Sequence, residues 1–130
     1  MMRNLYVKLS LLVVVFSLTF CLTASANPSI VSYGSSYSHS LSPGEGYAYI
    51  LPNARTSGTG VKINTAVPNS LQVKYYWSYN GTQLSVGPTV ISGTSYNGGF
   101  GYYEPGTLIT VVERVPGSTA GPVSYSISFN

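Results

Sequence analysis

The sequence predicts an all-β protein, an antiparallel β-sandwich of jelly-roll or Greek-key type, with a small barrel as the second choice. Three observations lead to this prediction. Short runs alternate apolar and polar residues, turn dipeptides rich in Gly, Pro and Asn separate them, and no stretch beyond the N-terminus repeats apolar residues with a helical period. Single-layer sheets would leave one apolar face of each strand in water, so two packed sheets are expected.

The N-terminal residues predict a signal peptide. Arg3 and Lys8 precede an apolar run over residues 9–22, and Ala24-Ser25-Ala26 follows it, which predicts cleavage after Ala26. The run falls short of the roughly 20 residues that span a bilayer. A lipid anchor on Cys21 is the alternative, but Phe20 stands where a small residue is needed. We therefore expect a secreted protein with one domain over residues 27–130 and no stable membrane anchor.

The predicted domain starts with four strand candidates, at residues 29–33, 37–42, 46–51 and 61–65. The clearest strand follows at residues 71–79, where alternation puts Trp77 on one face and Tyr76 on the other. We expect Trp77 to point inward. Asn80-Gly81 is typical of a type I′ hairpin turn, so residues 82–86 should pair back onto this strand.

The second half of the domain continues the same pattern. Residues 89–92 and 100–103 are weak strand candidates, and Gly98-Gly99 between them is interpreted as a turn. Residues 107–115 are apolar on both faces, as in a central strand. Val123, Tyr125, Ile127 and Phe129 alternate with serines, which predicts a final strand with one buried and one wet face.

Three segments resemble bacterial pre-peptidase C-terminal domains. They are residues 41–50 (LSPGEGYAYI), residues 105–111 (PGTLITV) and residues 123–129 (VSYSISF). The resemblance spans about ninety residues and implies a small secreted jelly roll without catalytic activity, of the kind appended to secreted enzymes. Relatives in that family often carry Asp residues, some associated with calcium. Residues 71–76 contain no Asp here, so the resemblance does not extend to a calcium site.

The inventory of reactive side chains argues against an enzyme. His39 is the one histidine, and Glu45, Glu104 and Glu113 are the acidic residues. A triad would need His39 beside one of these carboxylates, and glycoside hydrolysis would need two carboxylates together. We expect His39 on a strand surface and all three carboxylates in solvent.

No cofactor or metal site is expected either. Residues 27–130 contain no cysteine and one histidine, which is too few for zinc, and three scattered Glu are a poor set for calcium. Four basic residues against three acidic ones leave this part nearly neutral. A nearly neutral secreted domain is not expected to bind nucleic acid.

Aromatic side chains are the remaining candidates for function. The sequence has twelve Tyr and one Trp, and exposed aromatic rings offer rigid platforms for sugar rings and for protein partners. The candidate ligand-binding residues are Tyr47, Tyr49, Tyr76, Trp77, Tyr102 and Tyr103. The alternative is that these side chains form the core and cross-strand pairs.

The sequence therefore predicts a non-enzymatic binding or adhesion module for an extracellular polysaccharide or a cell-surface protein. Two alternatives remain open: a secreted antagonist resembling a bacteriocin, and a matrix component that self-associates through edge strands. Asn80-Gly81-Thr82 also matches a glycosylation sequon, which matters only in a eukaryotic source.

Overall fold

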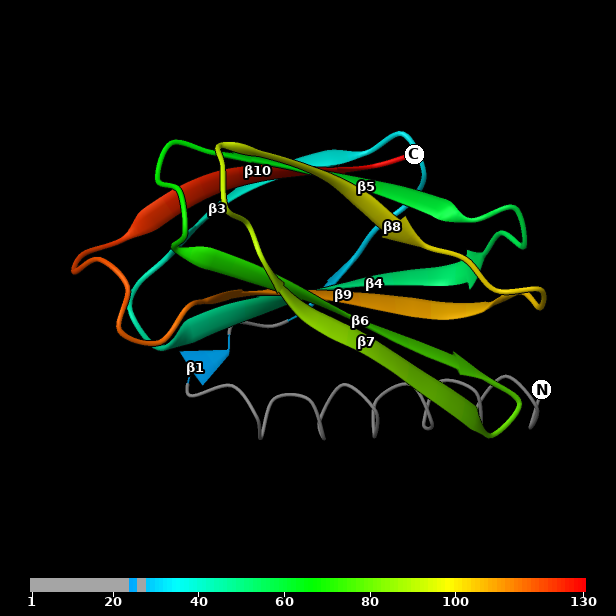
Figure 1. The fold of residues 1–130 in the computed structure, drawn as a ribbon. Coiled ribbons are helices and arrows are strands. Elements are labelled where there is room, and N and C mark those ends of the chain that lie inside the picture. The colour runs from blue at the N-terminus through cyan, green and yellow to red at the C-terminus, as the bar shows by residue number, and fades with distance from the viewer. Residues whose placement is uncertain (1–23, 26–27) are drawn as a thin grey trace.

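The computed structural model describes Ala24–Ser25 and residues 28–130, which form two β-sheets packed face to face (Figure 1). The predicted signal peptide falls on residues outside this range, apart from Ala24–Ser25. Cleavage after Ala26 therefore stays a prediction. Within the described ranges no helix is long and apolar enough to cross a membrane.

The sheets have the strand order of a jelly roll. The first sheet runs β1-β4-β9-β6-β7, with β2 also paired to β4, and the second runs β3-β10-β5-β8. The strands are β1 (Ala24–Ser25), β2 (Ser29–Ile30), β3 (Ser36–Leu41), β4 (Glu45–Ala54), β5 (Thr59–Thr65), β6 (Leu71–Tyr79), β7 (Thr82–Val90), β8 (Ser95–Phe100), β9 (Gly106–Arg114) and β10 (Val123–Phe129). All pairs among β3 to β10 are antiparallel, so the predicted sandwich is confirmed and the small barrel is not found.

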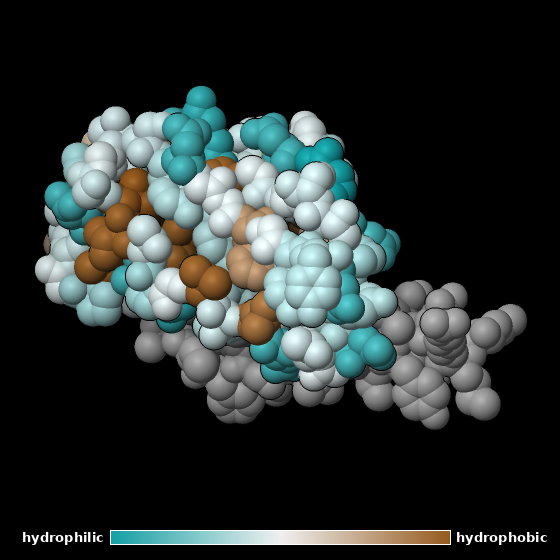
Figure 2. Space-filling model, turned by 45° about the vertical axis from the view of Figure 1, so that its right-hand side comes forward, coloured by the Kyte–Doolittle hydropathy of each residue, from teal (hydrophilic) through white to brown (hydrophobic). Residues whose placement is uncertain are grey.

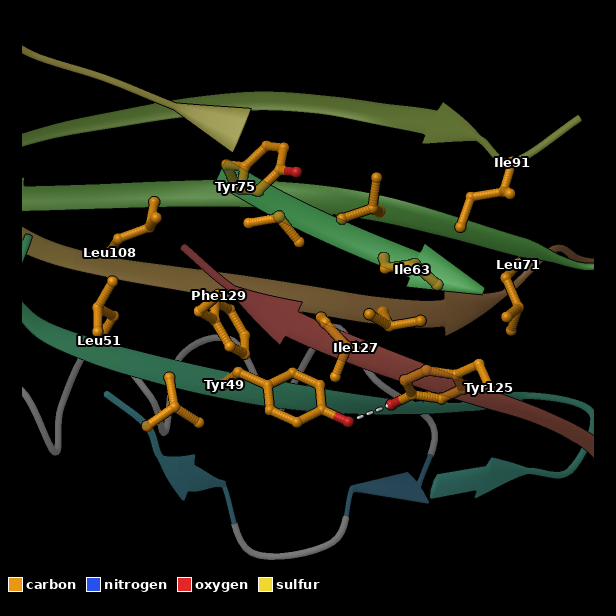
Figure 3. Packing of buried hydrophobic residues seen from close by; sticks show 14 of the residues in the cluster. Tyr49, Leu51, Ile63, Leu71, Tyr75, Ile91, Leu108, Tyr125, Ile127 and Phe129 are labelled. Atoms are coloured by element: carbon orange, nitrogen blue, oxygen red, sulfur yellow. Dashed lines mark hydrogen bonds between the residues drawn. The ribbon is translucent and has the colours of Figure 1, made fainter. Parts of the chain in front are cut away.

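Alternate side chains of both sheets fill the space between them. Leu71, Leu108, Ile63, Ile127 and Phe129 belong to one continuous buried cluster, and Figure 3 shows them directed into the gap between the layers. Burying a side chain of this kind stabilises the fold by about 1.5–3 kcal/mol. With no disulfide among the described residues, this cluster is the main source of stability.

Two predicted strand boundaries need correction. Residues 82–86 and 89–92 were expected as separate strands, but β7 runs through Thr82–Val90, because the register shift opposite Val73 and Tyr75 accommodates Gly87 and Pro88. Residues 100–103 are not a strand beyond Phe100, which ends β8. Gly98-Gly99 lies inside β8 and pairs with β5, so its interpretation as a turn was wrong.

Arg114, the last residue of β9, forms hydrogen bonds with backbone groups of neighbouring segments. This side chain is buried, and its guanidinium donates to the carbonyl oxygens of Leu41 (3.0 Å), Gly121 (2.6 Å) and Thr119. A buried charge is tolerated where hydrogen bonds replace its water. Arg114 therefore holds the segment between β9 and β10 against the start of the β3–β4 connection.

Candidate functional site

The structure separates the six candidate aromatic residues into buried and accessible ones. Tyr49 and Trp77 are buried, so neither can present a ring to a ligand, and the inward position predicted for Trp77 is confirmed. Tyr47 and Tyr76 are partly buried. Tyr102 is half-buried and Tyr103 is 74% exposed. The accessible aromatic surface therefore gathers around the last two residues.

Trp77, Tyr79, Tyr102 and Tyr103 form a continuous aromatic group that we call the aromatic corner. The ring centroids of Trp77 and Tyr102 are 4.3 Å apart, and those of Tyr102 and Tyr103 are also 4.3 Å apart. Tyr79 lies 6.0 Å from Trp77 and is exposed. These spacings are typical of interacting aromatic pairs. The rings therefore lead from the buried Trp77, through the half-buried Tyr102, to the exposed Tyr103.

Local sequence explains why the corner is held in place. Trp77 is on the inward face of β6, opposite Leu108 on β9 and Leu84 on β7. Gly106 begins β9 directly after the aromatic loop, and a β-carbon there would lie 2.5 Å from the indole ring of Trp77. The ring therefore packs on bare backbone. Asn80 and Gly81 both have positive φ, as expected for the hairpin turn that follows Tyr79.

The polar atoms of the corner are hydroxyls and one nearby carboxylate. The Tyr102 hydroxyl donates to the Tyr103 hydroxyl at 3.2 Å. This hydrogen bond, and after it partial burial and the charge of Glu104, raise the pKa of Tyr102 above its ordinary value. The corner therefore presents neutral hydroxyl donors beside ring faces.

The other candidate tyrosines have structural partners. Tyr47 pairs its hydroxyl with Ser29 at 2.7 Å, which connects β4 to β2. Tyr49 and Tyr125 share a buried hydroxyl hydrogen bond of 2.6 Å between the two sheets (Figure 3). Tyr76 packs against an aliphatic cluster on the outer face of the first sheet, formed by Ala48, Ile50, Ile109 and Val111.

His39 and Glu113 have structural partners. His39 does not lie on an open strand surface, because its ring packs 4.3 Å from that of Tyr47. Glu113 was expected in solvent but is buried, since Lys74 (2.7 Å) and Gln72 (2.5 Å) bind its carboxylate. Glu104 lies in the loop before β9, at the other end of that strand from Glu113. Among residues 28–130 and Ala24–Ser25, no cluster of His, Cys, Asp or Glu could hold a metal ion.

Sequence reasoning missed a second surface, the outward face of the second sheet. Alternation along four neighbouring strands leaves small polar side chains on this face, which we call the serine face. Its residues are Ser36, Ser38, Ser40, Lys62, Asn64, Ser95, Asn97, Ser124, Ser126 and Ser128. The wet face of residues 123–129 was predicted, but only the strand order shows that β3, β5 and β8 add matching rows beside it.

The comparisons with known proteins give fold-level likeness only. No protein-family model and no curated protein matches the chain. The chain is similar to the pre-peptidase C-terminal domain of a collagenase from Bacillus anthracis, with 12% identity, a TM-score of 0.43, and coverage of 82% of this chain and 95% of that one. This likeness accords with the weak resemblance noted in the sequence.

Two further solved structures are similar at the same level. One is the periplasmic inhibitor of g-type lysozyme from Aeromonas hydrophila, with 14% identity, a TM-score of 0.41, and coverage of 82% of this chain and 100% of that one. The other is a de novo designed double-stranded β-helix, with 19% identity, a TM-score of 0.39, and coverage of 74% of this chain and 99% of that one.

Proposed function

We propose that the protein is a secreted, non-catalytic binding module whose aromatic corner takes a sugar ring of an extracellular polysaccharide. The observation that carries the proposal is the arrangement of Tyr103, Tyr102 and Trp77, in which an exposed ring is braced by a half-buried and a buried one. A braced ring loses little side-chain freedom when a ligand stacks on it, which favours binding.

The chemistry of the corner suits a carbohydrate. A sugar ring has apolar faces edged by hydroxyls, and the corner offers ring faces with the hydroxyls of Tyr102 and Tyr103 at their rim. Glu104, the next residue along the chain, adds a hydrogen-bond acceptor.

Tryptophan fluorescence tests the proposal, because Trp77 is the only tryptophan and lies 4.3 Å from Tyr102. Soluble cellulose, chitin and mannan oligosaccharides would be titrated separately. We expect one of them to change the emission and to saturate. Tyr103→Ala should weaken that binding about 5- to 150-fold, if a sugar ring gains roughly the 1–3 kcal/mol that a nucleobase gains by stacking on an aromatic ring, whereas Tyr103→Phe should retain most of it.

Ile30→Ala provides the matched control, since Ile30 is as exposed as Tyr103 but lies on β2, on the opposite edge of the first sheet from β7. This variant should bind like the parent protein. If none of the oligosaccharides binds, or if Tyr103→Ala binds as tightly as the parent, the aromatic corner is not a sugar site.

A second candidate function is self-association into an extracellular matrix, and the exposed edge of β7 favours it. β7 ends the first sheet, and Val86 and Val90 on it are 50% and 44% exposed. Figure 2 shows brown aliphatic patches breaking a mostly pale and teal surface. Exposed edge strands pair with other chains unless charge or proline protects them, and β7 has no charged residue, although Pro88 interrupts it at the register shift. Light scattering that rises with concentration, and that Val86→Lys abolishes, would support this function.

A further inference from the structure

The serine face has a regular layout that the proposed function does not use. Directly opposed residues share a side of a sheet, so Ser38, Ser126, Asn64 and Ser95 form one row across all four strands. Ser36, Ser128, Lys62 and Asn97 form the next row. Neighbouring strands are about 4.8 Å apart. Small hydrogen-bonding groups therefore recur at even spacing over the whole face.

The same face is hollowed beside the first row. A shallow hollow, wide open to solvent, lies over Ser38, Ser40, Asn64, Ser124 and Ser126, and it extends to Ala66. His39, Thr65 and Tyr125 also line it, between the short polar side chains.

The serine face carries positive charge and no negative charge. Lys62 is exposed and shares its side of β5 with Asn64, two residues along the strand. The four strands of the second sheet contain no Asp or Glu and no other Lys or Arg. A cationic ligand would find no carboxylate on these strands, whereas a negative group would meet Lys62 beside rows of hydroxyl and amide donors.

We propose that the serine face is a second binding surface, which takes an extended, hydroxyl-rich polymer carrying negative charge, that is, an acidic polysaccharide. Hydroxyls on the polymer pair with the serine and asparagine rows in the hollow. A carboxylate on it pairs with Lys62. The surface lies on a different sheet from the aromatic corner and shares no residue with it. The two proposals can therefore be tested independently.

The test uses protein expressed with its own N-terminal segment in a secreting host and two forms of one polymer. Polygalacturonate should bind, and its fully methyl-esterified form, which has the same backbone without charge, should bind more weakly by isothermal titration. Lys62→Gln should weaken binding of the charged form about 2- to 5-fold. Ser38→Ala with Ser126→Ala should weaken binding of both forms, by about 2- to 10-fold for each hydroxyl.

Two control variants make the outcome specific. Arg55→Gln removes one positive charge from the exposed loop between β4 and β5, and Tyr103→Ala alters the aromatic corner; both should bind polygalacturonate like the parent. The proposal is overturned if polygalacturonate does not bind. It is also overturned if Arg55→Gln weakens binding as much as Lys62→Gln, or if Tyr103→Ala abolishes it. A change from dimer to monomer in the serine variants would instead show that this face meets a second copy.

Discussion

Two tyrosine pairs in this protein are joined through their hydroxyls in opposite surroundings. Tyr49 and Tyr125 meet at 2.6 Å inside the sandwich, whereas Tyr102 and Tyr103 meet at 3.2 Å in solvent at its end. If one hydroxyl of the buried pair is removed, no water can replace it as a hydrogen-bond partner. In the exposed pair, water can. The same chemical contact therefore contributes to folding in one place and remains available to a ligand in the other.

The largest expected effect removes the ring that connects the exposed pair to the core. Trp77→Ala should lower the free energy of unfolding by about 3–5 kcal/mol, because it empties a fully buried indole site. Urea denaturation measures the change. Trp77→Phe keeps a ring under Tyr102 and should cost clearly less, so equal losses in the two variants would contradict this account of the packing.

The next effect separates the two pairs directly. Tyr49→Phe should destabilise the protein by about 1–3 kcal/mol, because it leaves the buried Tyr125 hydroxyl without its partner. Adding Tyr125→Phe should recover much of that loss. Tyr102→Phe removes the corresponding hydroxyl of the exposed pair and is the control; a loss as large as that of Tyr49→Phe would show that burial does not distinguish the pairs.

Alkaline pH should reduce the stability that the buried pair provides. Burial raises the pKa of Tyr49 to about 12, against an unfolded value near 10. Burial and Tyr49 also raise the pKa of Tyr125. Since the folded state holds both protons more tightly, the contribution of Tyr49 is complete below about pH 10 and is lost as pH rises toward about 12, and the contribution of Tyr125 begins to fall from the same starting pH.

Denaturation at a series of pH values measures this dependence. The variant carrying Tyr49→Phe and Tyr125→Phe should lose stability less steeply between these pH values than the parent. Tyr75 is also buried, and burial raises its pKa too, so some slope should remain. An unchanged slope would mean that the pair does not set the alkaline limit.

The smallest expected effect on stability belongs to the outermost ring. Tyr103→Ala should change the free energy of unfolding by no more than about 0.5 kcal/mol, as is usual for exposed positions. Thermal denaturation measures it. A loss of several kcal/mol would mean that Tyr103 is part of the fold and would make any loss of binding in this variant uninformative.

The sequence predicted the fold where alternation and turn chemistry agree. Residues 71–79 and 123–129 match β6 and β10, because each alternates without interruption up to a turn or the chain end. The prediction was wrong at Gly98, because glycine occurs in turns and also in strands where a neighbouring side chain needs room. Gly98 reads as a turn residue, but in β8 it leaves room for the Tyr96 ring, whose hydroxyl would lie 2.1 Å from a β-carbon at this position.

The candidate surfaces were less predictable, because they depend on which strands become neighbours. Alternation correctly placed Trp77 inward and Tyr76 on the other face. It could not show that Tyr102, from a loop about 25 residues later in the chain, would cover Trp77. The serine face likewise combines strands from residue 36 to residue 128, whose adjacency is a property of the jelly-roll order alone.

The scarcity of basic residues has a practical consequence for proteolysis. Trypsin cuts after Lys and Arg, and the described residues contain four of these: Arg55, Lys62, Lys74 and Arg114. Lys62 and Lys74 are inside paired strands, and Arg114 is buried under its own hydrogen bonds. Arg55 alone of the four lies in an exposed loop, with its guanidinium 3.7 Å from the centre of the Tyr33 ring. Brief trypsin treatment should therefore cut residues 28–130 of the native protein at one bond, after Arg55, and the appearance of further fragments would report unfolding.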